Sequence, residues 1–218
     1  GNPVRCYTKP KVNAKHPKTT PVESDEFNSR QLGLQWEWHA NYQDVYGFTS
    51  DLGYMRLYGH VLSEEFVNFW EVPNLLLQKF PAETFTATTK LKVSAKADGQ
   101  QSGLIVMGWD YSYLAAVKEG EGFVLRQVTC KDAEQSGPEK MTTIATLPAT
   151  RIYEAGLHAN YELDIYMRVE VGKGGVCHFS YSTDNKRYTR TDITFTARQG
   201  KWIGAKVGLF STAPSDQQ

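Results

Sequence analysis

Hydrophobic and polar residues alternate with a period of two along much of this chain. From residue 85 to residue 93, apolar or small side chains take every second position and threonine or lysine fills the others. Residues 161–171 repeat the pattern, with Leu163, Ile165, Met167 and Val169 alternating with mostly charged neighbours. Strict alternation is typical of a strand with one buried and one solvated face. We therefore predict two long strands in these segments.

Shorter runs rich in β-branched and aromatic residues follow the same logic. They are LIVMGW (104–109), YLAAV (113–117), FVLRQV (123–128), VCHFSYS (176–182), RYTRTDITF (187–195) and WIGAKVGLF (202–210). The segments KEGEG and TDNK between them contain residues that tolerate tight turns, which predicts two hairpins. No segment keeps a 3.6-residue period. The pattern predicts an all-β fold, a two-sheet antiparallel β-sandwich of the jelly-roll kind.

The two ends of the chain differ from this pattern. Residues 1–23 carry four prolines in a basic stretch with little hydrophobic periodicity, as an extended linker would. The polar residues 211–218 are expected to form a C-terminal tail. The sandwich domain is therefore predicted to span residues 24–210.

Charge and cysteine content exclude several classes of function. Lysine plus arginine and aspartate plus glutamate number 24 each, so neither nucleic acid nor an anionic membrane is an expected partner. The three cysteines are far apart and include no CxxC pair, which indicates neither a disulfide framework nor a zinc site. Cys130 and Cys177 are predicted to be small buried strand residues. No apolar run reaches membrane-span length and no signal-peptide pattern is present, so no compartment is indicated.

No catalytic residues emerge from the motifs. A sandwich glucanase would present carboxylates on one strand in the order ExDxxE or ExDxE, because glycoside hydrolysis requires two carboxylates flanking the bond. Glu162 and Asp164 begin such a motif, but Tyr166 and Met167 stand where the third carboxylate should be. We interpret both acids as part of a solvated strand face.

Metal and cofactor sites are not indicated either. The histidines His39, His60, His158 and His178 lack metal-ligand spacing, and no nucleotide or phosphate fingerprint occurs. No cofactor is therefore expected, and nothing in the sequence indicates a structural calcium ion.

Aromatic residues gather in two places. The first, residues 31–48, has Leu32, Leu34, Trp36 and Trp38 at one parity, which fits a strand whose tryptophans face the core. An exposed sugar or protein contact is the alternative. In the second, residues 107–114, polar neighbours predict a strand end or loop with exposed rings. The candidate carbohydrate or domain contacts are Trp109, Asp110, Tyr111, Tyr113, Trp38, His39 and Tyr42.

Several stretches together resemble a known family. They are SDEFNSRQLGLQWEWHANYQ, NLLLQKF, SGLIVMGWDYSYL, FSYSTDNKRY and WIGAKVGLF, in this order. They are similar to the concanavalin A-like sandwich at the C-terminus of many glycoside hydrolase family 43 enzymes, which include β-xylosidases and α-L-arabinofuranosidases. The resemblance implies a catalytic five-bladed β-propeller upstream, which holds the catalytic carboxylates. It also implies that an aromatic loop of the sandwich reaches the catalytic pocket in some members, and GWDYSY is the nearest equivalent here.

Three functions remain open at this stage. The first is an ancillary module that packs on a propeller of the same polypeptide and shapes its pocket. The second is a carbohydrate-binding module that holds plant polysaccharide through exposed rings. The third, an independent glycosidase, lacks the motif it needs. The parent enzyme could be exported or cytoplasmic.

Overall fold

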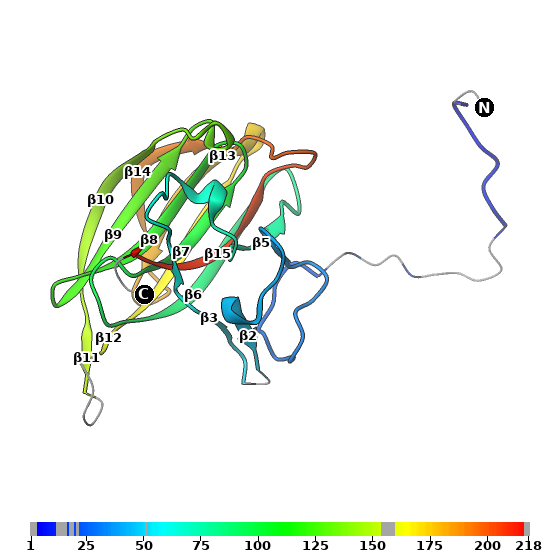
Figure 1. Ribbon diagram of the computed structural model, residues 1–218. Helices are drawn as coiled ribbons and strands as arrows, with labels where there is room; N and C mark the ends of the chain where they lie inside the picture. The colour runs from blue at the N-terminus through cyan, green and yellow to red at the C-terminus, as the bar shows by residue number, and fades with distance from the viewer. Residues whose placement is uncertain are drawn as a thin grey trace.

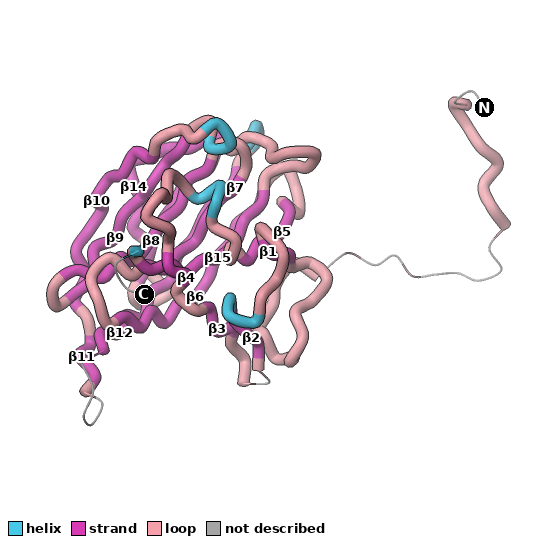
Figure 2. The backbone as a smooth tube through the Cα atoms, viewed as in Figure 1, coloured by secondary structure: helices cyan, strands magenta, loops and turns pink. Residues whose placement is uncertain are grey.

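The computed structural model describes residues 4–11, 17, 20, 22–50, 52–153 and 160–215. About half of these residues belong to two β-sheets packed face to face (Figure 1). The α-helix is absent from the described residues, and Figure 2 shows only short helical turns at the margins of the strands. None of the described helices has the length and apolar character that a membrane span needs. The predicted all-β sandwich is confirmed.

The larger sheet has eight strands among the described residues. In spatial order they are β1 (Glu37–Trp38), β5 (Leu76–Lys79), β15 (Lys206–Ala213), β7 (Gln101–Met107), β8 (Tyr111–Glu119), β9 (Gly122–Cys130) and β10 (Glu139–Pro148), with β4 (His60–Val61) beside β15. All these pairs are antiparallel except β4 with β15. The predicted turn KEGEG joins β8 to β9, where Gly120 has a φ of 55°.

The smaller sheet contains the strands with the cleanest alternation. Its members are β6 (Phe85–Ala95), β12 (Asn160–Val171), β13 (Val176–Ser182), β14 (Thr189–Thr196) and β11 (Thr150–Ile152). β12 pairs with β6 along one edge and with β13 and β11 along the other. The turn between β13 and β14 places Asn185 at a φ of 57°, as its turn-forming sequence predicts.

Short elements surround these sheets. They are the hairpin β2 (Gly47–Thr49) with β3 (Met55–Leu57), and the single-turn 3-10 helices η1 (Asp44–Tyr46), η2 (Phe69–Glu71), η3 (Ala133–Gln135) and η4 (Lys173–Gly175).

The main core lies between the two sheets. The predicted apolar face of β12 is buried there, with Ile165, Met167 and Val169 fully shielded from solvent. They meet Leu104, Leu114 and other apolar residues of the larger sheet. Cys177 lies in this core and Cys130 is buried on the opposite face of the larger sheet, so both are the buried strand residues that the sequence predicts.

A second core covers the outer face of the larger sheet. The segment around η2 lies across this face in Figure 1 and packs Phe69 and Leu75 onto Ile105, Tyr113 and Phe210. Both faces of the central strands are therefore buried, and all residues of β8 from Tyr111 to Lys118 are inaccessible. Tyr111 and Tyr113, which the sequence predicts to be exposed contact residues, are therefore buried.

The ends of the chain differ in how far they match expectation. Residues 4–11 are exposed and form no strand or helix, so their assignment to a linker stays a prediction. The C-terminal boundary is wrong by three residues, because β15 continues to Ala213 and buries Thr212 and Ala213. The same strand starts later than expected, at Lys206, and residues 197–205 before it form a loop.

Candidate functional site

Tyr111 and Tyr113 do not form an exposed platform, and the prediction that they do is wrong. Their exposed fractions are 0% and 2%. Phe69 of η2 stacks on the Tyr113 ring at a centroid distance of 4.6 Å, and the Tyr111 hydroxyl accepts a hydrogen bond from the Phe69 backbone N–H at 2.8 Å. The segment that covers this face is far from β8 in sequence, so the local polarity of YSY gave no sign of it.

The other half of GWDYSY lies at the surface. Trp109 and Asp110 form the turn between β7 and β8, with Trp109 half-buried. The Asp110 carboxylate accepts hydrogen bonds from the backbone N–H of Asp132 at 2.8 Å and from Arg198 at 3.3 Å. Asp110 therefore ties the β7–β8 turn to two other segments, which is a bracing role.

The first aromatic stretch is mostly loop. Of the predicted strand around the tryptophans only Glu37 and Trp38 form a strand, and Leu34 is fully exposed, so the predicted four-residue parity is wrong. Trp36 stacks on Phe27 and donates its indole N–H to Asp25 at 2.9 Å. These side chains hold the loop through local polar and ring contacts instead of a core.

Trp38 and Tyr42 form part of a small ring cluster. Trp38 lies 5.5 Å from Tyr46 and 5.7 Å from Tyr42, measured between ring centroids. Tyr46 is buried in this cluster, whereas Tyr42 is 53% exposed. Trp38 thus anchors the segment from residue 38 to residue 46, and Tyr42 borders solvent.

His39 lines a depression at one end of the larger sheet. Its Nε2–H donates to the Trp70 carbonyl at 3.0 Å, and burial lowers the pKa of the imidazole. The depression has a volume of about 310 Å³, and its remaining walls are Trp70, Met107, Gly108, Gly200, Lys201, Ile203, Gly204 and Lys206. The structure therefore brings His39 close to the β7–β8 turn and to the loop 197–205.

That loop carries the residue which sequence reasoning missed. Trp202 is 94% exposed and has a φ of 67°, a conformation uncommon for a bulky side chain. The prediction of a single strand over WIGAKVGLF placed Trp202 in the sheet, so its exposure in a loop was not expected. The glycines Gly200 and Gly204 on either side of it were the available signal, because two glycines within five residues indicate a loop as readily as a strand.

A second group of large apolar side chains is exposed in the N-terminal part of the chain, between residues 34 and 58. The large ones are Leu34, Tyr42, Val45, Phe48, Leu52, Tyr54 and Tyr58. In Figure 1 the lobe that holds them, around β2 and β3, lies on the side of the sandwich from which the N-terminal segment leaves. The loop before β15 projects on this side too. GWDYSY contributes none of the large exposed apolar side chains among the described residues.

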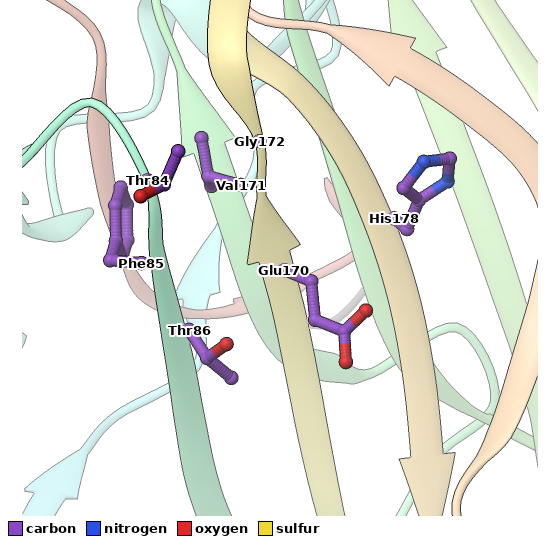
Figure 3. A pocket seen from close by; sticks show the side chains of 7 residues that line it. All are labelled: Thr84, Phe85, Thr86, Glu170, Val171, Gly172 and His178. Carbon is purple, nitrogen blue, oxygen red and sulfur yellow. The ribbon is translucent and has the colours of Figure 1, made fainter.

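A second depression, of about 400 Å³, lies on the smaller sheet (Figure 3). Thr86, Glu170 and His178 come from three adjacent strands, and Glu170 is the register partner of both others. Its described lining contains one carboxylate only, so it does not supply the pair that glycoside hydrolysis requires. We interpret it as a shallow part of a solvated sheet face.

Glu162 and Asp164 do not form a catalytic pair of carboxylates either. Glu162 and Asp164 both face Lys92, whose Nζ lies 3.1 Å and 3.9 Å from their carboxylate oxygens. This arrangement is an ordinary ion cluster on a strand face.

Among the described residues, no group of three or more His, Cys, Asp or Glu side chains could hold a metal ion. His158 lies outside the described residues.

Comparison with known proteins places this geometry in a family. The family described as "Beta xylosidase C-terminal Concanavalin A-like domain" matches residues 24–218. A β-xylosidase of Formosa agariphila is 29% identical over 234 residues, covering 97% of this chain and 35% of the relative. The chain thus spans about a third of that relative's length.

Solved structures show the same fold. A family 43 protein of Bacillus licheniformis superposes with a TM-score of 0.66 at 18% identity, over 93% of this chain and 38% of that one. An engineered family 43 glycoside hydrolase with endo-xylanase and exo-arabinofuranosidase activity gives a TM-score of 0.65 at 20% identity, over 93% and 39% of the two chains. On the family match, this chain belongs to the β-xylosidase C-terminal concanavalin A-like domains.

Proposed function

We propose that this chain is the non-catalytic ancillary sandwich of a family 43 glycoside hydrolase that acts on xylose- or arabinose-containing plant polysaccharide. In this proposal it packs on an upstream catalytic β-propeller of the same polypeptide and shapes the catalytic pocket. Family membership and the 35% coverage of a β-xylosidase support a place within a longer enzyme.

One observation carries the pocket-shaping part of the proposal. Trp202 presents its ring to solvent at 94% exposure from a backbone conformation that costs free energy for a non-glycine residue. Strained backbone conformations cluster at functional sites, and tryptophan is enriched among the residues that contribute most to interfaces. The loop projects on the side from which the N-terminal segment leaves the sandwich (Figure 1), so an upstream domain would lie within its reach.

The docking part of the proposal rests on the exposed apolar side chains between residues 34 and 58. An interface within a chain leaves apolar side chains exposed when one domain is viewed alone. Leu34, Tyr42 and Phe48 are such side chains, at 105%, 53% and 44% exposure. The alternative function, a free carbohydrate-binding module, loses its expected platform because Tyr111 and Tyr113 are buried.

The chemistry of hydrolysis belongs, in this proposal, to the upstream domain. Glu162 and Asp164 share one lysine on a solvated face, and the depression around Glu170 has a single carboxylate. We expect the chain alone to leave aryl xylosides and arabinosides intact.

The deciding experiment uses the polypeptide that carries both the upstream domain and this chain. Trp202→Ala should lower kcat/KM on aryl xylosides or arabinosides by about tenfold, the equivalent of one lost aromatic contact. Tyr153→Ala is the matched control, since Tyr153 is 74% exposed but lies next to β11, at the opposite end of the sandwich in Figure 1. Equal activity of the two variants would remove the pocket-shaping role.

A further inference from the structure

The loop 197–205 is held by the body of the sandwich on several sides. The Trp109 backbone N–H donates to the Gln199 carbonyl at 3.1 Å, and the Ala205 carbonyl accepts from the Phe80 N–H at 3.2 Å. Lys201 Nζ lies 2.8 Å from Glu134 of η3. Only residues 202–204 lie between these anchors, so the direction of the Trp202 ring depends on how the anchors sit.

Arg198 is the side chain that joins the anchoring segments. Its Nη1 lies 2.7 Å from Asp132 Oδ1 and 3.3 Å from Asp110 Oδ1. The Asp132 N–H in turn donates to Asp110 at 2.8 Å. One guanidinium therefore connects the loop, the β7–β8 turn and the turn before η3.

The surroundings of Arg198 limit its freedom to move. The guanidinium carbon lies 5.0 Å from the centroid of the Trp109 ring, within range of a cation–π contact. On the backbone side, a methyl group at Gly108 would lie 1.9 Å from the Arg198 carbonyl oxygen, so only glycine permits this approach. A single exposed ion pair contributes little to stability. Arg198 is instead restrained by two carboxylates, the Trp109 ring and a close backbone contact with Gly108.

We infer that Arg198, bridging Asp110 and Asp132, is a positioning residue that sets the direction in which Trp202 faces the upstream catalytic pocket. The inference rests on the proposed function for its consequence in catalysis, but not for its effect on the loop. Lysine is an imperfect substitute, because its ammonium can pair with a carboxylate but lacks the planar guanidinium group that lies near the Trp109 ring while Nη1 contacts both aspartates.

The direct test measures the loop in this chain. The heteronuclear NOE of the Trp202 indole N–H, recorded on ¹⁵N-labelled protein, should fall in Arg198→Ala and fall less in Arg198→Lys. Arg151→Ala is the matched control, because Arg151 also combines an ion pair with ring contacts, to Glu121, Tyr153 and Tyr161, near the other end of the sandwich. An unchanged NOE in Arg198→Ala would overturn the inference, whatever the enzyme assays give.

The second test is a double-mutant cycle on kcat/KM in the polypeptide that includes the upstream domain. Arg198→Ala should lower kcat/KM by about three- to tenfold when Trp202 is present, with Arg198→Lys intermediate. It should have no effect in the Trp202→Ala background, since a positioning residue acts only through the residue it positions. Equal losses in both backgrounds would contradict the inference. A Trp202→Ala variant with full activity would refute the proposed function instead, and the NOE alone would then decide on Arg198.

Discussion

The phenol of Tyr111 donates a hydrogen bond to Oε1 of Glu139 across a distance of 2.6 Å. The same hydroxyl accepts from the backbone N–H of Phe69, so one side chain of β8 fastens both the strand β10 and the covering turn η2. Burial without such partners would be costly for a carboxylate and for a backbone N–H. This polar link explains how a sheet face with two tyrosines and a glutamate can be covered by an apolar segment.

Removing the Tyr111 hydroxyl should destabilise the fold. Tyr111→Phe leaves the Phe69 N–H and the Glu139 carboxyl without this partner, and we expect a loss of about 1–3 kcal/mol in the free energy of unfolding. Urea denaturation of the two proteins measures it. The control Tyr166→Phe removes a hydroxyl from the outer face of β12 and should change stability by less than about 0.5 kcal/mol. A Tyr111→Phe protein as stable as this control would mean that the link contributes nothing.

The buried carboxyl of Glu139 should make the free energy of unfolding depend on pH. Burial raises the pKa of its carboxyl above the ordinary value, although hydrogen bonds from Tyr111 and Tyr113 act in the opposite direction. The folded protein therefore holds this proton more tightly than the unfolded chain. The stabilisation is present at acidic pH and is lost as the pH rises through the raised pKa.

A glutamine at this position does not titrate. The stability of Glu139→Gln relative to the unmodified protein should therefore increase between about pH 4 and about pH 7. Unfolding curves at several pH values give this difference directly. If the difference stays constant or shrinks with rising pH, the carboxyl does not have the raised pKa.

Gly108, beside the Trp202 loop, and Gly204, within it, should respond differently to substitution by alanine. Gly108→Ala places a methyl group 1.9 Å from the Arg198 carbonyl oxygen, so the loop or the β7–β8 turn must shift. We expect a cost of about 1–3 kcal/mol. Gly204→Ala finds no atom within 4 Å and is the control. Equal effects of the two substitutions on the urea midpoint would show that the loop does not lie against the turn.

The parts of the fold that follow from the sequence are those fixed by local pattern. The alternation in residues 85–93 and 161–171 predicts nearly all of β6 and β12, because side-chain direction in a strand repeats every two residues. The turn residues Gly120 and Asn185 are likewise local signals. A period-two pattern with one polar face is therefore sufficient to predict the two longest strands of the smaller sheet.

The candidate site depends on contacts that are distant in sequence. Phe69 covers Tyr111 from 42 residues away, and Arg198 reaches Asp110 across 88 residues. Neither partner can be inferred from the composition around the other. The sequence therefore pointed to the GWDYSY turn, which lies beside the Trp202 loop, but assigned exposure to its buried tyrosines and overlooked the exposed Trp202.

If the end of the sandwich that carries Trp202 packs on an upstream domain, that domain should shield Trp202 from solvent. Hydroxyl-radical labelling with mass spectrometry should be carried out on this chain and on the polypeptide that includes the upstream domain, with Tyr153 as the internal reference. We predict that labelling of Trp202 falls several-fold in the longer polypeptide while that of Tyr153 is unchanged. Equal labelling of Trp202 in both proteins would contradict it.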